Sequence, residues 1–133
     1  MEGKRFSGKH VLITGGGRGI GFEIARQFGR EGARLAIFEY DRELLDNACR
    51  ELEVEGCKVN PYFVDVSVRK EVFDAVEGCE KIAPIDVLIN NAGIAFETPF
   101  LNIDEDEWRK IIDINLTGMF FVNVSYVFLA QLQ

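Results

Sequence analysis

The sequence predicts an α/β domain built on a doubly wound parallel sheet. Apolar runs of strand length alternate four times with helical stretches of ten or more residues, which is typical of parallel sheets with right-handed crossovers. The first apolar run, residues 9–14, is continuous rather than alternating, as expected for a strand that is buried on both faces. The chain of 133 residues has no internal repeat, linker or low-complexity segment. It therefore forms one domain or part of one.

The first half of the chain contains two strand–helix units. A strand over residues 9–14 leads into a helix over 19–30, whose apolar side chains share one face. A second strand over 34–39 leads into a helix over 41–55 that carries charge on one side and leucines on the other. Asp41 is placed to cap the start of this helix.

The second half begins with a strand over residues 58–64. Pro61 lies within it and predicts an irregular or edge position, because proline cannot donate to a sheet. A helix follows over 68–82, for which Ser67 is the expected N-cap, and a fourth strand covers 86–90.

A long helix is expected from Asp104 to near the end of the chain. Asp104 and Glu107 have the spacing of a capping box. Apolar residues run from Met119 to Val122 and from Val127 to Leu129 within this helix. Exposed apolar patches drive association, so we expect a homo-oligomer contact through this last helix.

Composition excludes several classes of function. The net charge of −7 argues against nucleic acid and anionic membranes as partners, because both require clustered Lys and Arg. No run of eighteen apolar residues and no signal-peptide core is present, so we expect a soluble, cytoplasmic protein. The three cysteines lack metal-ligand spacing, and no metal site is expected. His10 is expected at the surface or at an edge.

The stretch from Thr14 to Gly21 reads TGGGRGIG and joins the first strand to the first helix. Free backbone N–H groups and the helix dipole favour an anion at such a place. Gly15 suits the positive φ of a tight turn, Gly19 has no Cβ to block a pyrophosphate, and Gly21 allows the helix to lie close to the strand. A flexible turn without a ligand is the alternative.

Eighteen residues after Gly21, Glu39 ends the second strand. A carboxylate there can accept hydrogen bonds from the ribose of adenosine and repels a 2′-phosphate, which favours NAD over NADP. Arg18 argues the other way, because a guanidinium beside the phosphate loop can pair with a 2′-phosphate. A solvated glutamate and a surface arginine are the purely structural alternatives.

The ends of the third and fourth strands are also polar. Asp65 can accept a hydrogen bond from the adenine amino group while Val66 offers an apolar wall, although Asp65 equally suits a helix N-terminus. Asn91 can tie strand ends together, and Gly93 allows a ligand to approach the backbone. Asn115 is an amide among isoleucines and a leucine, and it is either a structural tie or part of a site.

Together these motifs resemble the classical short-chain dehydrogenase/reductase family, from about Ser7 to the end of the chain. The resemblance implies a Rossmann-type fold, NAD(H) or NADP(H) as cofactor, and hydride transfer between the nicotinamide and an alcohol or carbonyl. It also implies that Asn115 is the family's catalytic asparagine, which bends its helix and holds a water in the proton relay. The expected cofactor-binding residues are Thr14, Gly15, Gly17, Arg18, Gly19, Ile20, Gly21, Glu39, Asp65, Val66, Asn91, Ala92 and Gly93.

The family's catalytic serine and Tyr-x-x-x-Lys pair have no counterpart in these 133 residues. Tyr126 is followed four residues later by Ala130 rather than by lysine. We therefore expect a truncated domain of about four strands and four helices, which retains the cofactor motifs and lacks the catalytic half. Such a chain should be inactive alone or nearly so, and its substrate is not identified. The main alternative is a non-catalytic nucleotide-binding or interaction module.

Overall fold

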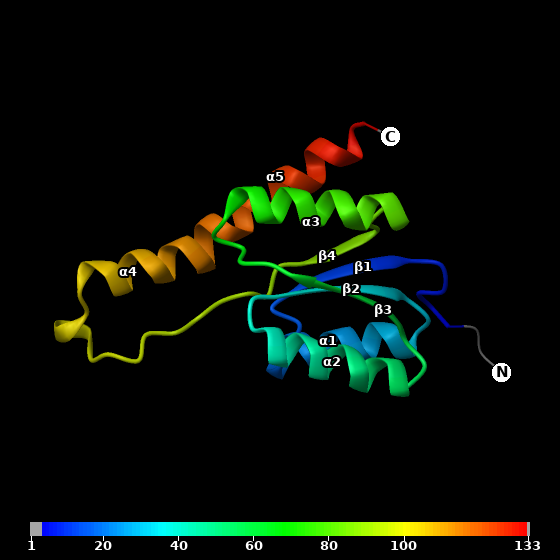
Figure 1. Ribbon diagram of the computed structural model, residues 1–133, viewed down its shortest axis with the longest axis horizontal. Coiled ribbons are helices and arrows are strands. Elements are labelled where there is room, and N and C mark those ends of the chain that lie inside the picture. The colour runs from blue at the N-terminus through cyan, green and yellow to red at the C-terminus, as the bar shows by residue number, and fades with distance from the viewer. Residues whose placement is uncertain (1–3, 133) are drawn as a thin grey trace.

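A computed structural model describes residues 4–132 as a parallel sheet between two layers of helices (Figure 1). Helices α1 and α2 cover one face of the sheet, and α3 and α5 cover the other. The strands are β1 (His10–Thr14), β2 (Arg34–Glu39), β3 (Lys58–Phe63) and β4 (Val87–Ile89). The helices are α1 (Gly19–Arg30), α2 (Arg42–Val54), α3 (Arg69–Ile82), α4 (Glu105–Ile112) and α5 (Gly118–Ala130). The predicted parallel α/β architecture is confirmed.

The strand order β3-β2-β1-β4 places a switch point beside β1. The chain moves outward from β1 to β2 and β3, then crosses back to pair β4 with the other side of β1. Ligands of such sheets bind beyond the carboxyl ends of the strands at this point. The edge position predicted from Pro61 is confirmed, because β3 pairs only with β2 among the described strands.

The two faces of the sheet carry separate apolar cores. Leu12 and Phe38 pack with side chains of α3 and α5, including Val76 and Val122. Ile13 and its neighbours on the other face pack with side chains of α1 and α2. Burying one such side chain contributes roughly 1.5–3 kcal/mol to the stability of the fold. Packing on both faces therefore stabilises the positions of the strands.

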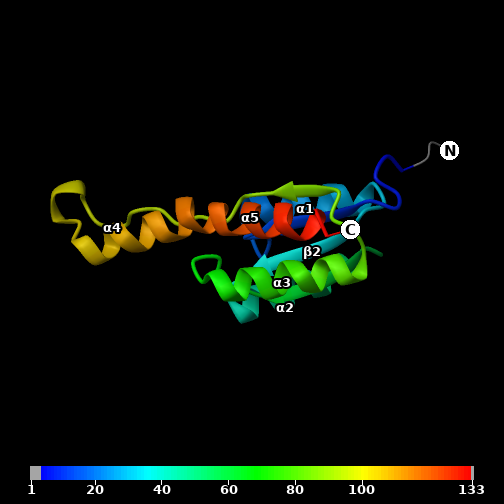
Figure 2. The same ribbon diagram turned by 90° about the horizontal axis from the view of Figure 1, so that it is seen from above.

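The predicted long helix is present but interrupted. Asp104 accepts a hydrogen bond from the Glu107 N–H, as predicted for the cap. Between α4 and α5, residues Asp113–Thr117 form a π-helical turn, η2, so that the three segments run end to end (Figure 2). The segment Glu105–Ala130 is long and apolar enough to cross a membrane by length and composition. Helix α5 packs against α3 and buries Val122 in the core, and 22% of the apolar window of this segment is buried.

Two local predictions are wrong. Ser67 does not cap α3, because Asp65 Oδ1 accepts both its N–H and its hydroxyl; Val68 is the N-cap and offers no side-chain oxygen. His10 is only 1% exposed rather than at the surface. Its Nδ1 lies 2.8 Å from the Ala83 carbonyl oxygen, and the Asp86 carboxylate accepts its backbone N–H, so the segment before β4 covers it.

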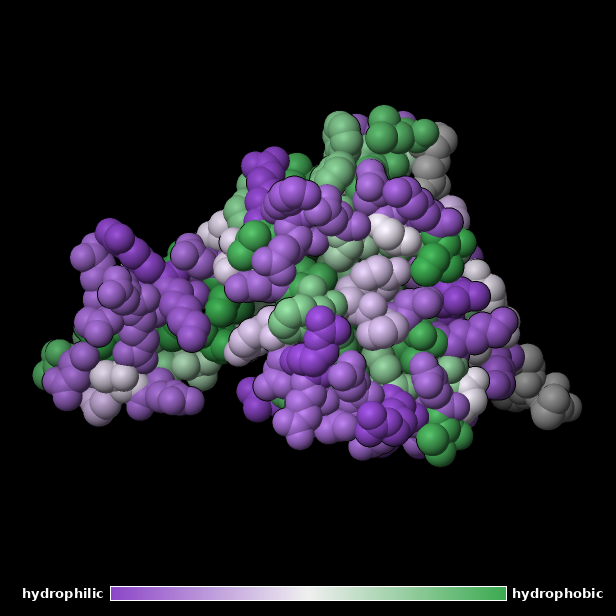
Figure 3. All heavy atoms as spheres, viewed as in Figure 1, coloured by the Kyte–Doolittle hydropathy of each residue, from purple (hydrophilic) through white to green (hydrophobic). Residues whose placement is uncertain are grey.

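The surface differs between the two helical layers. Figure 3 shows mainly polar side chains over the α1–α2 side, and apolar side chains gather at the end of α5. Val127 and Phe128 are half-exposed there, as are Met119 and Phe120 at the start of the same helix. An apolar surface on α5 therefore accompanies its buried core face.

Candidate functional site

The glycine turn after β1 leaves the N-terminus of α1 open. Gly15 has a φ of +65°, as the predicted tight turn requires. Gly19 has a φ of +57°, and a Cβ there would meet no atom within 4 Å, so its outer side is free. No side chain caps the first turn of α1 and no acidic residue lies in it. The unpaired N–H groups and the helix dipole make this end suitable for an anion.

Gly21 explains how closely α1 approaches the strand ends. A Cβ at this position would overlap the Gly15 carbonyl oxygen and the Asn91 side-chain amide. The close approach predicted for Gly21 is therefore present, and the neighbour is the turn itself together with the end of β4.

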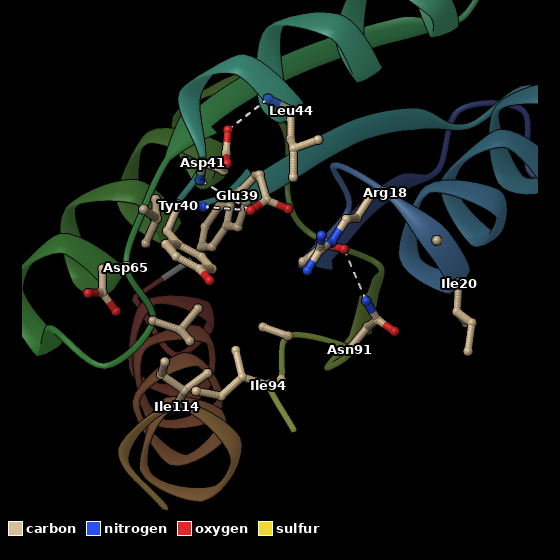
Figure 4. A pocket seen from close by; sticks show the side chains of 17 residues that line it. Arg18, Ile20, Glu39, Tyr40, Asp41, Leu44, Asp65, Asn91, Ile94 and Ile114 are labelled. Carbon is tan, nitrogen blue, oxygen red and sulfur yellow. Dashed lines mark hydrogen bonds between the residues drawn. The ribbon is translucent and has the colours of Figure 1, made fainter. Parts of the chain in front are cut away.

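A cavity of about 450 Å³ opens beyond the carboxyl ends of the strands, at the switch point. We call it the switch-point crevice (Figure 4). The predicted residues that line it are Gly15, Arg18, Gly19, Ile20, Glu39, Asp65, Val66, Asn91, Ala92 and Gly93. The sequence predicted these residues from separate strand ends, and the fold brings them to one place.

Glu39 is the buried acid of the crevice, with 6% of its surface exposed. Its Oε1 accepts the Gly17 N–H at 3.1 Å. Its Oε2 accepts the N–H groups of Tyr40 and Asp41 at 3.1 and 3.2 Å. A buried carboxylate needs such partners, so three backbone donors fix the position of this charge. The alternative of a solvated strand-end glutamate does not apply.

Arg18 and Tyr40 lie on either side of Glu39 and are exposed along the crevice wall (Figure 4). Arg18 is the N-cap residue of α1 and brings a positive charge to the open helix end. Tyr40 adds an aromatic ring beside the acid. The crevice thus combines the buried negative charge of Glu39 with the solvent-facing positive charge of Arg18.

Asp65 and Val66 form the wall after β3. Asp65 Oδ1 accepts from the N–H and hydroxyl of Ser67, at 2.9 and 2.6 Å, and its Oδ2 has no described partner. Val66 is buried and contributes an apolar surface to the crevice. The structural role of Asp65 at the turn and a role toward a ligand are therefore compatible.

Thr14 and Asn91 tie the ends of β1 and β4 together. The Thr14 hydroxyl accepts the N–H groups of Asn91 and Ala92 at 3.0 and 2.9 Å. The Asn91 side chain donates to the carbonyl oxygens of Thr14 and Gly15 at 3.2 and 3.1 Å. Thr14 does not line the crevice but holds its wall in place.

Asn115 lies in the π-helical turn and clamps the next part of this wall. Its Oδ1 accepts the Ile94 N–H and its Nδ2 donates to the Ile94 carbonyl oxygen, both at 2.8 Å. The Gly118 N–H donates to the Asp113 carbonyl oxygen, five residues back, as in a π-helix. Such bulges are frequent at functional sites, and the helix irregularity expected at Asn115 is present.

Seven lining residues were not predicted from the sequence, namely Phe38, Tyr40, Asp41, Leu44, Val64, Ile94 and Ile114. Tyr40 carried a usable signal, because it directly follows Glu39 at the strand end. Ile94 and Ile114 carried none beyond their place beside Gly93 and Asn115. Tyr126 lies elsewhere and donates its hydroxyl to the Ile85 carbonyl oxygen. No group of acidic, histidine or cysteine side chains in residues 4–132 is arranged to hold a metal ion.

Comparison with known proteins agrees with this geometry. The family model for short chain dehydrogenases matches residues 9–131. The chain is 41% identical over 118 residues to 5-keto-D-gluconate 5-reductase of Escherichia coli K12, covering 88% of this chain and 46% of that protein. It is 38% identical over 124 residues to a 3-oxoacyl-(acyl-carrier-protein) reductase of Thermotoga maritima, covering 92% and 50%.

Solved structures are similar as well. The crystal structure of a 3-oxoacyl-(acyl-carrier-protein) reductase from Brucella melitensis superimposes with a TM-score of 0.85 at 30% identity, over 94% of this chain and 48% of that one. The chain spans about half the length of the curated relatives it matches. On the match of the family model, the chain belongs to the short-chain dehydrogenase family of oxidoreductases.

Proposed function

We propose that this chain supplies the cofactor-binding part of an NAD-dependent oxidoreductase, which transfers hydride between a nicotinamide and a secondary alcohol or ketone. The observation that carries the proposal is the switch-point crevice, in which an open helix N-terminus and a buried carboxylate face one cavity. When bound, NAD supplies the centre that accepts or donates the hydride.

The described residues fit such a dinucleotide. The open side of Gly19 and the uncapped first turn of α1 suit a pyrophosphate. Glu39 is the acceptor for ribose hydroxyls, and Val66 with Asp65 provides an apolar wall beside a polar acceptor for adenine. Gly15, Gly17, Gly21 and Thr14 keep these groups in place.

The preference for NAD over NADP rests on Glu39. Its charge is buried and held by three backbone N–H groups, and moving it away from an incoming 2′-phosphate would break these hydrogen bonds. Arg18 is exposed, and an exposed charge pair contributes little, about 0–1 kcal/mol. Repulsion from the buried acid therefore outweighs attraction by the exposed arginine.

Asn115 is proposed as the site asparagine that orders water in the proton relay. Its two bonds to Ile94 fix the segment after Gly93 at the edge of the crevice. The 133 residues contain no Tyr-x-x-x-Lys pair to donate a proton, so we expect this chain to bind the cofactor and show negligible turnover by itself. The names of three relatives refer to 5-keto-D-gluconate, galactitol and 3-oxoacyl-(acyl-carrier-protein), so the proposed substrate stays at the level of a secondary alcohol or ketone.

Titration of the purified chain with NADH and NADPH tests the proposal. Calorimetry should give tighter binding of NADH, and Glu39→Gln should reduce the difference between the two nucleotides by removing the charge while keeping the side-chain length. Tighter binding of NADPH to the wild type would contradict the role given to Glu39. Failure to bind either nucleotide would contradict the proposal as a whole.

We also propose that copies of the chain associate through the exposed apolar side of α5, where Phe120 and Phe128 are half-exposed. Sedimentation equilibrium should show an oligomer, and Phe120→Glu should shift it toward the monomer. A wild-type chain that is monomeric at high micromolar concentration would contradict this contact.

A further inference from the structure

We infer that Gly17 is the positioning residue for the Glu39 carboxylate, and that its lack of a side chain sets the discrimination between NADH and NADPH. The inference rests on the proposed function. It concerns a contact across 22 residues of sequence, between the glycine turn after β1 and the end of β2. The glutamate side chain reaches the backbone of residue 17, and only glycine leaves room for it there.

The two oxygens of Glu39 are not equivalent. A carboxylate offers about four acceptor positions, two on each oxygen. Oε2 already accepts the N–H groups of Tyr40 and Asp41. Among residues 4–132, Oε1 accepts only the Gly17 N–H, so it is the oxygen with capacity for a further donor. The Gly17 N–H therefore orients the oxygen on which a ribose hydroxyl would depend.

The turn packs directly onto the same carboxylate. A Cβ at Gly17 would lie 2.6 Å from Oε1, 2.7 Å from Cγ and 2.9 Å from Cδ of Glu39. These distances are shorter than carbon contacts allow. All three atoms belong to one flexible side chain, so a methyl group at this position would displace Glu39.

The backbone of Gly17 does not itself require glycine. Its φ is not positive, unlike those of Gly15 and Gly19 in the same turn, so alanine fits the local conformation. The three atoms nearest to the added Cβ all belong to the Glu39 side chain. The requirement for glycine at this position thus comes from the acid and not from the turn.

Five variants test the pair: Gly17→Ala, Glu39→Asp, Glu39→Ala, and Gly17→Ala combined with each of the two Glu39 substitutions. Dissociation constants for NADH and NADPH are measured by calorimetry for each, and circular dichroism checks the fold. Gly78→Ala is the matched control, because it adds a methyl group in α3, away from the crevice, with Tyr62 at 3.3 Å as its nearest neighbour. It should leave both constants unchanged.

Gly17→Ala should weaken NADH binding about tenfold, since it removes an oriented hydrogen bond to a charged group, and should lower the ratio of the NADPH to the NADH dissociation constant. The double variant with Glu39→Asp should regain part of that ratio, because aspartate is one bond shorter and places no oxygen at the Oε1 position, which lies 2.6 Å from the added Cβ. In the Glu39→Ala background, where no acid can be displaced, Gly17→Ala should change the ratio less than twofold.

A wild type without preference for NADH would refute the proposed function and this inference with it. A wild type that prefers NADH, combined with an unchanged ratio in Gly17→Ala or an equal loss for both nucleotides, would refute the inference alone. The same holds if Gly17→Ala lowers the ratio in the Glu39→Ala background as much as in the wild type. If Gly17→Ala fails to fold, the double variant and the Glu39→Ala background still decide the question.

Discussion

Replacing Thr14 by valine should remove hydrogen bonds between the ends of β1 and β4 without changing the shape of the core. Thr14 is 2% exposed, and its Oγ1 accepts the N–H groups of Asn91 and Ala92. Valine keeps the branched side chain but has no acceptor. Both donors would then lose their only described partner in a half-buried position.

The expected loss follows from these two donors. A fully buried unsatisfied N–H group costs roughly 1–3 kcal/mol, and half-burial places each donor near the lower end of that range. Thr14→Val should therefore lower the free energy of unfolding by about 2–3 kcal/mol. That is a large share of the 5–15 kcal/mol typical of a domain.

Urea unfolding followed by circular dichroism measures this loss. Thr14→Ser is the matched control, because serine keeps the acceptor oxygen and removes one methyl group, which is worth about 1 kcal/mol. The reasoning is refuted if the valine variant lies within about 0.5 kcal/mol of the wild type, which is the usual range for surface substitutions. It is also refuted if serine destabilises the chain as much as valine does.

Three further predictions concern other parts of the chain. Asn115→Asp removes the donor to the Ile94 carbonyl oxygen and sets two acceptors against each other, so hydrogen exchange at the Ile94 amide should become several-fold faster. Asp104→Ala removes the acceptor for the Glu107 N–H and should cost about 1 kcal/mol in urea unfolding, while Asp104→Ser should restore most of it. Burial raises the pKa of the Cys79 thiol from 9.0 to about 12, so the folded state favours the neutral thiol. Stability from this thiol is complete below pH 9.0 and is lost as the pH rises toward 12; the unfolding free energy of Cys79→Ala should fall less steeply over that range.

Local patterns were sufficient for the fold because they were consistent with one another. The continuous apolar run at β1 is buried along its whole length, and the helix predicted over 19–30 has those bounds. Pro61 correctly indicated an edge strand. In each of these cases the type of residue directly limits the backbone conformation or determines whether the segment is buried.

The errors arose where a residue depends on partners far along the chain. His10 is buried because Ala83 and Asp86, more than seventy positions away, accept its hydrogen bonds. Ser67 lost its expected capping role to competition, since Asp65 binds both of its donors. Such choices between rival partners depend on distances that a linear pattern does not contain.

The candidate site was predictable at its strand ends and not at its helix. Glycines and polar residues after β1 to β4 mark one edge of the sheet, since the carboxyl ends of parallel strands lie together. Gly17 contacts Glu39, and Ile114 lines the crevice. Both features depend on where the turn and the helix are positioned relative to the strand ends. Side-chain reach of this kind has no signature in residue spacing.

The π-helical turn shows how one irregularity serves several neighbours at once. Ile114 lines the crevice, and the next residue, Asn115, clamps Ile94 on the opposite strand-end segment. Gly118 then lies so close to Val66 that a Cβ would be 2.7 Å from its Cγ2. The helix therefore touches the wall after β3 and the wall after β4 within five residues. An extra residue in this turn places an apolar side chain in the crevice lining and an amide on the segment after β4.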